Sequence, residues 1–457
     1  MILTGFFTEK ELQLMAKRFL VGESGGPTPV IDWEVAGALA AAQASGWEAY
    51  GMINGLEGLL NANIPGNIVD LSHMDPMAFV FNGPGAGLDT TRIKPKDDQY
   101  KKMAENLKAL GIDAVVYFGG NDSADQLLGL AKHAGVQVIH GIKTVDNDLP
   151  VTHHCPGYGS ATLFNATAIK TVHSDYSSYL TRSNFKAGEK VVQGWDTAPA
   201  IIYQVMGRKE GWLAQGTGFA KVDPAGTIDP DRPPHIILTK EIPFSKERFL
   251  AKADEVISRL GEVVIVVQED LTDAASGKSI AEVYAEKEVS RDEHGNIQWG
   301  RVSSFSTAIF LAQVVTQELK VKAVLGKVKE VALVPQHIQR SYSMSNVDAS
   351  EAYRVGSACV KALNEKLTKK SVILTRENKG RTITGITELE NIAAKDRSVP
   401  LEWINGLDGP TQDFVDEFIY LIGGPAAIPH YSKLCFGTVP VPQAIAANPY
   451  VKPEKKK

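Results

Sequence analysis

The feature that most constrains the fold is an alternation of short apolar runs with amphipathic helical segments. DAVVYF (113–118) and VQVIHG (136–141) are apolar and rich in β-branched residues, and a helical segment that stops at Gly135 separates them. KSVILTREN (370–378) has the same character. Strands that alternate with helices form parallel sheets whose faces the helices cover. The sequence therefore predicts an α/β fold.

The middle of the chain repeats this pattern. HIILTKEIPF (235–244) and EVVIVVQED (262–270) read as strands, and 246–261 between them has helical spacing. Residues 182–197 and 222–234 are polar and rich in Gly and Pro, so we expect loops there. Open parallel sheets bind ligands at the carboxyl ends of their strands, which makes the turns at those ends the candidate site.

Length, charge and cysteine content narrow the class of protein. The 457 residues suffice for two or three domains, and a net charge of −5 argues against general binding to nucleic acids or membrane surfaces. Cys155, Cys359 and Cys435 are odd in number and far apart, which favours reduced thiols in the cytoplasm. We find no signal peptide and no uncharged apolar run of the ~20 residues that a membrane span requires.

Two glycine-rich turns could hold anions. GESGGPTP begins at Gly22 and precedes an Ala-rich helical segment, so backbone amides and the positive end of the helix would face one point. FNGPGAGLDTTR (81–92) crowds three glycines before Arg92, which suits a phosphate clamp. Taken alone, a tight structural turn explains the first segment better than an anion site does, and an ordinary surface arginine explains the second segment equally well. Neither segment is a Walker A or G-x-G-x-x-G motif, which disfavours a Rossmann dehydrogenase.

Two acidic turns follow predicted strands. In FGGNDS (118–123) the polar residues could cap the next helix, or a carboxylate could hold Mg²⁺. In GIKTVDNDLP (141–150), Asp146 and Asp148 would point to one side if the segment is extended. One could then take a proton while the other holds a metal, and Lys143 could neutralise phosphate oxygens. An Asp/Asn-rich turn is the alternative interpretation.

Four such turns in one α/β chain favour a polyphosphate site over four coincidences. Two further motifs, QVMGRKEGW (204–212) and HIQRS (337–341), supply Arg208 and Arg340, which could receive the phosphate of a second ligand.

Taken in order, the motifs resemble those of the phosphofructokinase family. ESGGPTP, GGNDS, KTVDNDLP, CPGYGSA, VMGRKEGW, KEIPF and HIQRS occur in the family's order and cover about residues 20–345. The resemblance implies two Rossmann-like domains, each a mainly parallel sheet sandwiched by helices, with the active site in the cleft between them. Residues 1–158 plus about 340–395 would bind the phosphoryl donor. Residues 159–339 plus about 396–457 would bind the sugar phosphate.

The resemblance also implies a reaction and the residues that perform it. The family phosphorylates the 1-hydroxyl of fructose 6-phosphate with the help of Mg²⁺. The implied catalytic residues are Asp146, as the base that takes the hydroxyl proton, with Lys143, Thr144 and Arg208. The implied donor site comprises Gly25, Gly26, Arg92, Gly120, Asn121, Asp122, Ser123 and Lys143. The implied sugar site comprises Thr144, Asp146, Asp148, Met206, Gly207, Arg208, Glu241, His337 and Arg340. Mg²⁺ would be held by Asp122 and Asp148.

Two positions indicate the phosphoryl donor by resemblance. Members of the family that use ATP have Gly where this chain has Asp122, and Gly where it has Lys143. A carboxylate at 122 would intrude on the inner phosphate of a nucleotide, and a cation at 143 suits the highly charged pyrophosphate. We therefore expect reversible phosphoryl transfer from pyrophosphate, as in glycolysis and gluconeogenesis.

Three departures from the family pattern stand out. Asn121 replaces a metal-binding Asp of the ATP users. The family also takes arginines from a neighbouring subunit, but DTAPAIIYQ (196–204) has none, and Lys327 or Lys329 could serve for the other. Asp32 stands where we expect Asn, for which the sequence offers no explanation.

Three alternatives to a pyrophosphate-dependent phosphofructokinase stay open: an ATP-dependent phosphofructokinase, an enzyme that keeps the pyrophosphate donor but takes sedoheptulose 7-phosphate, and a weakly catalytic regulatory paralogue. The resemblance further implies a homodimer or homotetramer.

Overall fold

The computed structural model describes residues 17–81, 85–178, 200–284, 306–319, 330–335, 337–340, 344–377 and 380–429. The predicted loop at 182–197, Lys327, Lys329 and Cys435 lie outside these residues. Across the described ranges, none of the helices combines the length and the apolar character that crossing a bilayer requires.

The first sheet is mainly parallel and combines strands from the first third of the chain with two strands from its last quarter. In the part of the chain that the structure describes, seven strands are ordered β11-β10-β5-β4-β1-β2-β3. Their bounds are β1 Arg18–Glu23, β2 Glu48–Met52, β3 Ile68–Asp70, β4 Ala114–Gly119, β5 Gln137–Ile142, β10 Lys370–Arg376 and β11 Thr382–Glu388. The pairs β2–β3 and β10–β11 are antiparallel, and the other pairs are parallel.

The second sheet is smaller and entirely parallel. Within the described residues it has four strands in the order β7-β8-β6-β9, with bounds β6 Ala200–Gln204, β7 Ile236–Leu238, β8 Val263–Val267 and β9 Glu330–Leu333. Side chains alternate between its two faces, as the pleat of a strand requires. Ile201 and Tyr203 join the core on one face, whereas Ala200 and Ile202 join the core on the other. Both faces are therefore buried.

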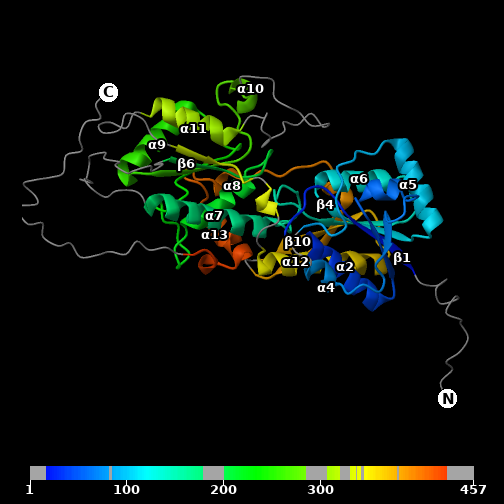
Figure 1. Cartoon of the computed structure of the whole chain (residues 1–457). Helices are drawn as coiled ribbons and strands as arrows, with labels where there is room; N and C mark the ends of the chain where they lie inside the picture. The colour runs from blue at the N-terminus through cyan, green and yellow to red at the C-terminus, as the bar shows by residue number, and fades with distance from the viewer. Residues whose placement is uncertain are drawn as a thin grey trace, which may run out of the picture.

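Helices cover both faces of both sheets (Figure 1). Figure 1 shows α5 and α6 on one side of the first sheet and α2, α4 and α12 on the other. The α-helices are α2 Ile31–Ser45, α3 Leu56–Leu60, α4 Met77–Phe81, α5 Asp97–Leu110, α6 Asn121–Ala131, α7 Tyr158–Ser178, α8 Trp212–Gly216, α9 Lys246–Leu260, α10 Ile280–Tyr284, α11 Thr307–Glu318, α12 Asn346–Asn364 and α13 Gln412–Phe418. Short 3₁₀ helices are η1 Thr217–Lys221, η2 Ile338–Arg340, η3 Leu389–Asn391, η4 Leu401–Trp403, η5 Ile419–Ile422 and η6 Pro425–Ala427.

The late helix α12 packs directly on the early helix α2. A Cβ atom at Gly37 would lie 2.0 Å from the carbonyl oxygen of Tyr353, and one at Gly356 would lie 1.8 Å from that of Glu34. No side chain fits at such distances, so the two glycines allow the backbones to touch. This contact fixes the returning segment of the chain against the first sheet.

The predicted α/β fold, with mainly parallel sheets between helices, is confirmed. The predicted strand at 235–244 is wrong in length, because β7 ends at Leu238. The chain turns there, as Ile242 N donates to Thr239 O at 3.2 Å. The domain boundaries inferred from the resemblance stay a prediction.

Candidate active site

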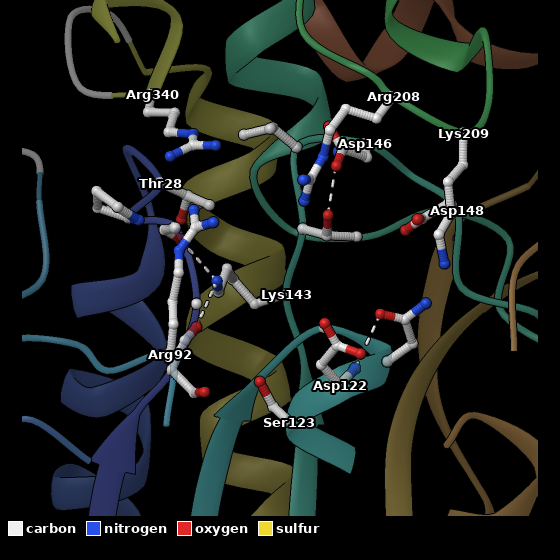
Figure 2. Close-up of a pocket in the computed structure, with 18 of the residues that line it drawn as sticks. Thr28, Arg92, Asp122, Ser123, Lys143, Asp146, Asp148, Arg208, Lys209 and Arg340 are labelled. Carbon is white, nitrogen blue, oxygen red and sulfur yellow. Dashed lines mark hydrogen bonds between the residues drawn. The ribbon is translucent and has the colours of Figure 1, made fainter. Parts of the chain in front are cut away.

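A polar cavity of about 310 Å³ lies where loops from the two sheets meet (Figure 2). Its walls come from the turns after β1, β4 and β5, from the turn after β6, and from η2. The residues inferred from sequence that line it are Gly25, Gly26, Arg92, Gly120, Asn121, Asp122, Ser123, Lys143, Thr144, Asp146, Asp148, Arg208 and Arg340. The structure thus brings together segments as far apart in the chain as Gly25 and Arg340.

Four residues of the predicted sugar site do not line this cavity. Met206 is buried, and its N–H donates to Gln339 Oε1 at 3.0 Å. Gly207 N donates to a buried carboxylate at 3.3 Å, and His337 is exposed. Glu241 lies behind the wall, where its Oε1 accepts from Gly211 N at 2.8 Å.

Lys143 is buried against the first glycine-rich turn. Its Nζ donates to Ser24 O at 2.8 Å and to Gly26 O at 2.7 Å, while Gly25 between them has a φ of 78° that favours glycine. Burial lowers the pKa of Lys143 to about 8. The ammonium group therefore shapes the turn at the same time as it places a positive charge beside the cavity.

Two buried carboxylates join the two glycine-rich turns. Glu23 Oε2 accepts from Leu88 N at 2.9 Å, and Asp32 Oδ1 accepts from Gly87 N at 2.7 Å. Burial raises the pKa of both side chains, and the negative charge of Asp32 raises that of Glu23 further. Asp32, which the sequence left unexplained, thus anchors the second turn to the start of α2.

Glu34 on α2 is fully buried, and neither of its side-chain oxygens has a hydrogen-bond partner among the described residues. Burial raises its pKa well above the ordinary value of 4.5, although Lys143 nearby opposes the rise. The folded chain therefore keeps a proton on Glu34 that the unfolded chain releases above pH 4.5.

We expect Glu34→Gln to become more stable than the wild type as the pH rises. A raised folded-state pKa contributes full stability below the unfolded value, and that contribution is lost as the pH rises toward the folded value. The difference in unfolding free energy should grow by up to about 1.4 kcal/mol per pH unit. Urea unfolding at pH 5.5 and pH 8 measures it, with Glu105→Gln at an exposed site of α5 as the control. An equal difference at both pH values would contradict the expectation.

The acidic turn after β5 is not extended. Asn147 has a φ of 54°, and its buried side chain accepts from Cys155 N at 2.9 Å, so the chain reverses between the two aspartates. Thr144 Oγ1 accepts from Asp146 N at 3.1 Å. The condition of an extended segment is therefore not met and the segment is a turn, but Asp146 and Asp148 still line one cavity (Figure 2).

The charge around Asp148 is unfavourable without a counterion. Burial, followed by the negative charges of Asp146 and Asp396, raises the pKa of Asp148 to about 8. A divalent cation would offset this excess of negative charge. Asp122 and Asp148 supply the carboxylate oxygens that Mg²⁺ prefers, and Mg²⁺ commonly takes only one or two carboxylates together with substrate phosphates. The donor set therefore fits Mg²⁺.

Arg397 supports the acidic turn from behind. Its backbone N donates to Asp148 O at 2.7 Å, and its Nη2 donates to Asn147 O at 3.0 Å. The guanidinium group lies 4.4 Å from the ring centroid of Trp212, whose Nε1 donates to Arg397 O at 2.8 Å. Trp212 is the last residue of the QVMGRKEGW motif that carries Arg208, so Arg397 ties the acidic turn to the opposite wall of the cavity.

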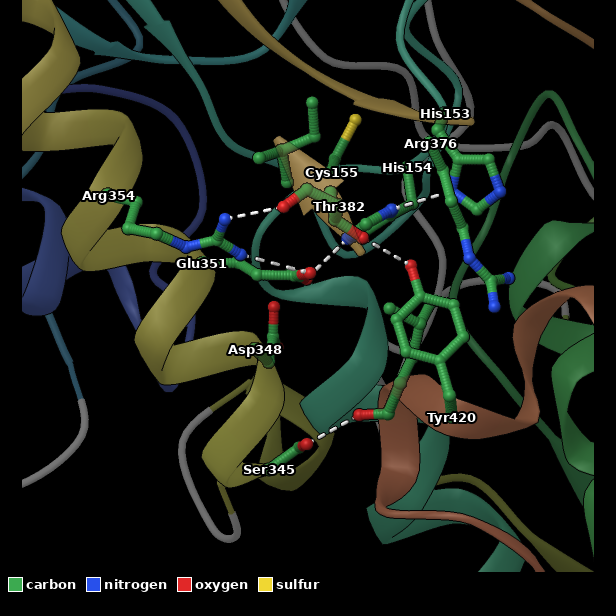
Figure 3. Close-up of polar contacts among 12 residues, drawn as sticks. His153, His154, Cys155, Ser345, Asp348, Glu351, Arg354, Arg376, Thr382 and Tyr420 are labelled. Carbon is green, nitrogen blue, oxygen red and sulfur yellow. Dashed lines mark hydrogen bonds and ion pairs between the residues drawn. The ribbon is translucent and has the colours of Figure 1, made fainter. Parts of the chain in front are cut away.

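A largely buried polar cluster holds the residues that directly follow the acidic turn (Figure 3). His154 Nε2 lies 2.6 Å from Glu351 Oε2 on α12, and His153 Nε2 lies 2.8 Å from Glu417 Oε1 on α13. Burial lowers the pKa of His153 to about 4. Asp348 of α12 accepts from backbone amides at the start of α7 at 2.8–3.2 Å. Helices from late in the chain thereby fix the turn that carries Asp146.

Helix α6 points its amino end at the cavity. Gly120 is its N-cap and makes no side-chain cap, whereas Asn121 Oδ1 accepts from the amide of Asp122 in the first turn at 2.8 Å. Asp122 is exposed in the first helical turn, and Ser123 is buried. Free amides at a helix start attract anions, whereas the Asp122 carboxylate repels them unless a cation lies between.

Arg340 lies against the first glycine-rich turn. A Cβ atom at Gly26 would come within 2.8 Å of Arg340 Cζ and Nη1. We therefore expect Gly26→Ala to displace the guanidinium group and to raise the KM for a sugar phosphate about 10-fold, which is the effect of weakening one charged hydrogen bond.

Initial-rate kinetics with the sugar phosphate that the resemblance implies, fructose 6-phosphate, measure this effect. Gly85→Ala is the matched control, since no described atom lies within 4 Å of its added Cβ. An equal change in KM for both variants would contradict the expectation for Gly26.

The cavity also contains residues that the sequence did not single out. Thr28, Lys94, Gln126, Lys209 and Glu210 line it. Lys209 and Glu210 follow Arg208 directly within a motif that the resemblance covers, so their position in the chain is the one available indication.

A cleft that sets carboxylates against arginines and a buried lysine suits the transfer of a phosphoryl group between anionic substrates, so the fold and the cavity together define a phosphotransferase. Residues 18–185 and 197–363 match the family model described as Phosphofructokinase. The chain belongs to the phosphofructokinase family.

Curated relatives and solved structures agree with this family. The chain is 31% identical over 418 residues to a pyrophosphate–fructose 6-phosphate 1-phosphotransferase of Rhodospirillum rubrum, which covers 89% of this chain and 94% of the relative. It is 33% identical over 356 residues to the protein of that name in Xanthomonas campestris, over 75% of each chain. The crystal structure of a pyrophosphate-dependent phosphofructokinase from Marinobacter aquaeolei superposes with a TM-score of 0.69 at 26% identity, covering 93% of this chain and 98% of that one.

Proposed function

We propose that this chain catalyses the reversible, Mg²⁺-dependent transfer of a phosphoryl group from pyrophosphate to the 1-hydroxyl of fructose 6-phosphate. The observation that carries the proposal is that Asp122 and Lys143 line the same cavity as Asp146 and Asp148. Relatives that cover most of the chain bear the name of this activity.

Asp146 takes the proton from the sugar hydroxyl in this proposal. The hydrogen bond from its N–H to Thr144 Oγ1 fixes its backbone, and Arg208 lies beside it at the cavity wall (Figure 2). A carboxylate within reach of the hydroxyl makes the oxygen nucleophilic as the phosphoryl group arrives. Protein groups contribute mainly position and charge to such a transfer.

The donor lies between the first glycine-rich turn and the start of α6. Lys143 and Arg92 neutralise pyrophosphate oxygens, and the glycine backbone at Gly25 and Gly26, whose first amide donates to Thr91 O at 3.2 Å, lets the donor come close. Asp122 disfavours a nucleotide there, because its carboxylate adds both bulk and like charge. Arg208, from the turn after β6, and Arg340, from η2 beside the first glycine-rich turn, hold the sugar phosphate.

Asp122 and Asp148 would hold Mg²⁺ with the donor phosphates. Bound Mg²⁺ would neutralise charge on the phosphoryl group during transfer. Glu241 supports the sugar side from behind the wall, and its Oε2 has no hydrogen-bond partner within the described residues.

The reverse reaction tests the proposal. With fructose 1,6-bisphosphate, inorganic phosphate and Mg²⁺, the protein should form fructose 6-phosphate and pyrophosphate. The reaction runs in this direction because the free energies of hydrolysis of pyrophosphate and of the sugar 1-phosphate ester are similar. ADP in place of phosphate should give no ATP. Formation of ATP without pyrophosphate would overturn the proposed donor.

We also propose that the chain acts in the cytoplasm as a homodimer or homotetramer. Two of its cysteines, Cys155 and Cys359, are buried free thiols, which suits a reducing compartment. The assembly follows from family membership, and light scattering coupled to size exclusion measures it.

A further inference from the structure

The segment Ala394–Val399 touches both the donor side and the catalytic side of the cavity. Ala394 N approaches Asn121 O on α6 at 3.4 Å, and Arg397 N donates to Asp148 O at 2.7 Å. Ala394 also has a φ of 54°, a conformation that a residue with a side chain adopts only where its surroundings impose it. The path of this segment is therefore fixed by the site that it borders.

Asp396 in this segment divides one carboxylate between two partners. Its Oδ1 accepts from Asn121 Nδ2, and its Oδ2 lies 2.6 Å from Lys209 Nζ. Asn121 begins α6 beside the first sheet, whereas Lys209 lies in the turn after β6 of the second sheet. The Asp396 side chain is 26% exposed and the Lys209 side chain 54%, so solvent screens the ion pair on its lysine side. One aspartate thus joins the two halves of the protein at the edge of the cavity.

The hydrogen bonds of Asn121 fix the orientation of its side-chain amide. Its Nδ2 donates to Asp396 and to Lys395 O at 3.3 Å, while its Oδ1 accepts from Asp122 N at 2.8 Å. An aspartate at 121 would place a second carboxylate in hydrogen-bond contact with Asp396, where like charges repel. The amide at position 121 is therefore matched to the carboxylate at position 396.

Lys209 has a second set of acidic neighbours. Asp122 and Asp148 act on its ammonium group electrostatically, and Figure 2 shows Lys209 beside Asp148. The ion pair with Asp396 therefore engages an ammonium group that also lies within electrostatic reach of the two carboxylates that face the cavity.

We propose that Asp396 is a positioning residue for phosphoryl transfer, which holds Asn121 and Lys209 together across the edge of the cavity and requires an amide at position 121. The kinetic part of this inference rests on the proposed function. The pairing with Asp396 explains why this chain has Asn where ATP-dependent members of the family have a metal-binding carboxylate. Asn121 orients Asp122 through its hydrogen bond to the amide of that residue, and Asp122 and Asp148 would hold the metal.

A double-mutant cycle tests the pairing. Asn121→Asp should lower kcat/KM for pyrophosphate about 30-fold through charge repulsion, and Asp396→Asn about 5-fold through loss of the Lys209 ion pair. The double variant exchanges acid and amide, so it should recover to within about 5-fold of the wild type. Most of the recovery should appear in the KM for pyrophosphate, because the donor side is what the pair positions. A double variant whose loss equals the product of the two single losses would overturn the inference.

Urea unfolding of the same four proteins, without substrate, separates this inference from the proposed function. The two substitutions should be coupled in the urea midpoint, with Asn121→Asp the least stable and the double variant restored. Additive midpoints would overturn the pairing even if the enzyme is active. A wild type that turns over neither donor would overturn the proposed function, while coupled midpoints would still support the pairing.

Discussion

Replacing Asp146 with asparagine should lower kcat for phosphoryl transfer about 10³-fold, the usual contribution of a general base. Asparagine keeps the size of the side chain and the backbone hydrogen bond from residue 146 to Thr144 Oγ1, but it cannot take a proton. Fructose 6-phosphate should still bind with an affinity within about 3-fold of the wild type, because Arg208 and Arg340 supply the charge that holds it.

Steady-state kinetics and isothermal titration calorimetry with fructose 6-phosphate measure the two effects separately. Asp125→Asn is a matched control, since Asp125 is an exposed residue of α6 that does not line the cavity. An unchanged kcat in Asp146→Asn would remove Asp146 from the catalytic role, whereas a lost affinity with normal kcat would make it a binding residue.

Exchanging the two donor residues should change the phosphoryl donor. Lys143→Gly should raise the KM for pyrophosphate about 30-fold, because about 2 kcal/mol of charged hydrogen bonding is lost. The structure adds a second reason, since Lys143 Nζ also holds the carbonyls of Ser24 and Gly26 in the first glycine-rich turn. Adding Asp122→Gly removes the carboxylate from the start of α6 and should make ATP a measurable donor.

The matched control for this double variant is Lys143→Gly with Asp125→Gly. It places glycine in the same helix, at a cost of about 1 kcal/mol of helix stability, but away from the cavity. Use of ATP by both double variants would mean that loosening α6, and not removing the Asp122 carboxylate, admits the nucleotide. Use of ATP by neither would mean that other residues also exclude it.

The strands and helices near the cavity could be predicted from periodicity. β4, β5 and β8 are short apolar runs that are buried on both faces, and α9 has a clear apolar stripe. Each of these elements can therefore be recognised from its own residues alone. β11 was not predicted. It is an antiparallel edge strand with exposed Ile383 and Ile386, and its sequence TITGITE lacks the continuous apolar run of its neighbours.

The candidate site could be predicted where chemistry is concentrated in one turn. Asp146, Asp148 and Lys143 occur within six positions, and the structure places all of them at one cavity. Their roles stay predictions. The bend at Asn147 was missed because a left-handed residue depends on its partner, here the amide of Cys155 eight positions away.

The residues that support the site could not be predicted, because their partners are distant in the chain. Asp396 lies 275 positions from Asn121, and Arg397 lies 250 positions from Asn147. Neither belongs to a motif, and nothing in AAKDRSVP (393–400) indicates a binding site. Such contacts arise only when the chain returns to the first sheet and then crosses to the second.

The choice of phosphoryl donor is the most direct test of the function proposed for this chain. Purified protein would be assayed with fructose 6-phosphate and Mg²⁺, with either pyrophosphate or ATP, and the fructose 1,6-bisphosphate formed would be measured through aldolase. We expect turnover with pyrophosphate and a kcat/KM for ATP at least about 100-fold lower, since Asp122 and Lys143 act in the same direction. Turnover with ATP and none with pyrophosphate would contradict the roles given to both residues.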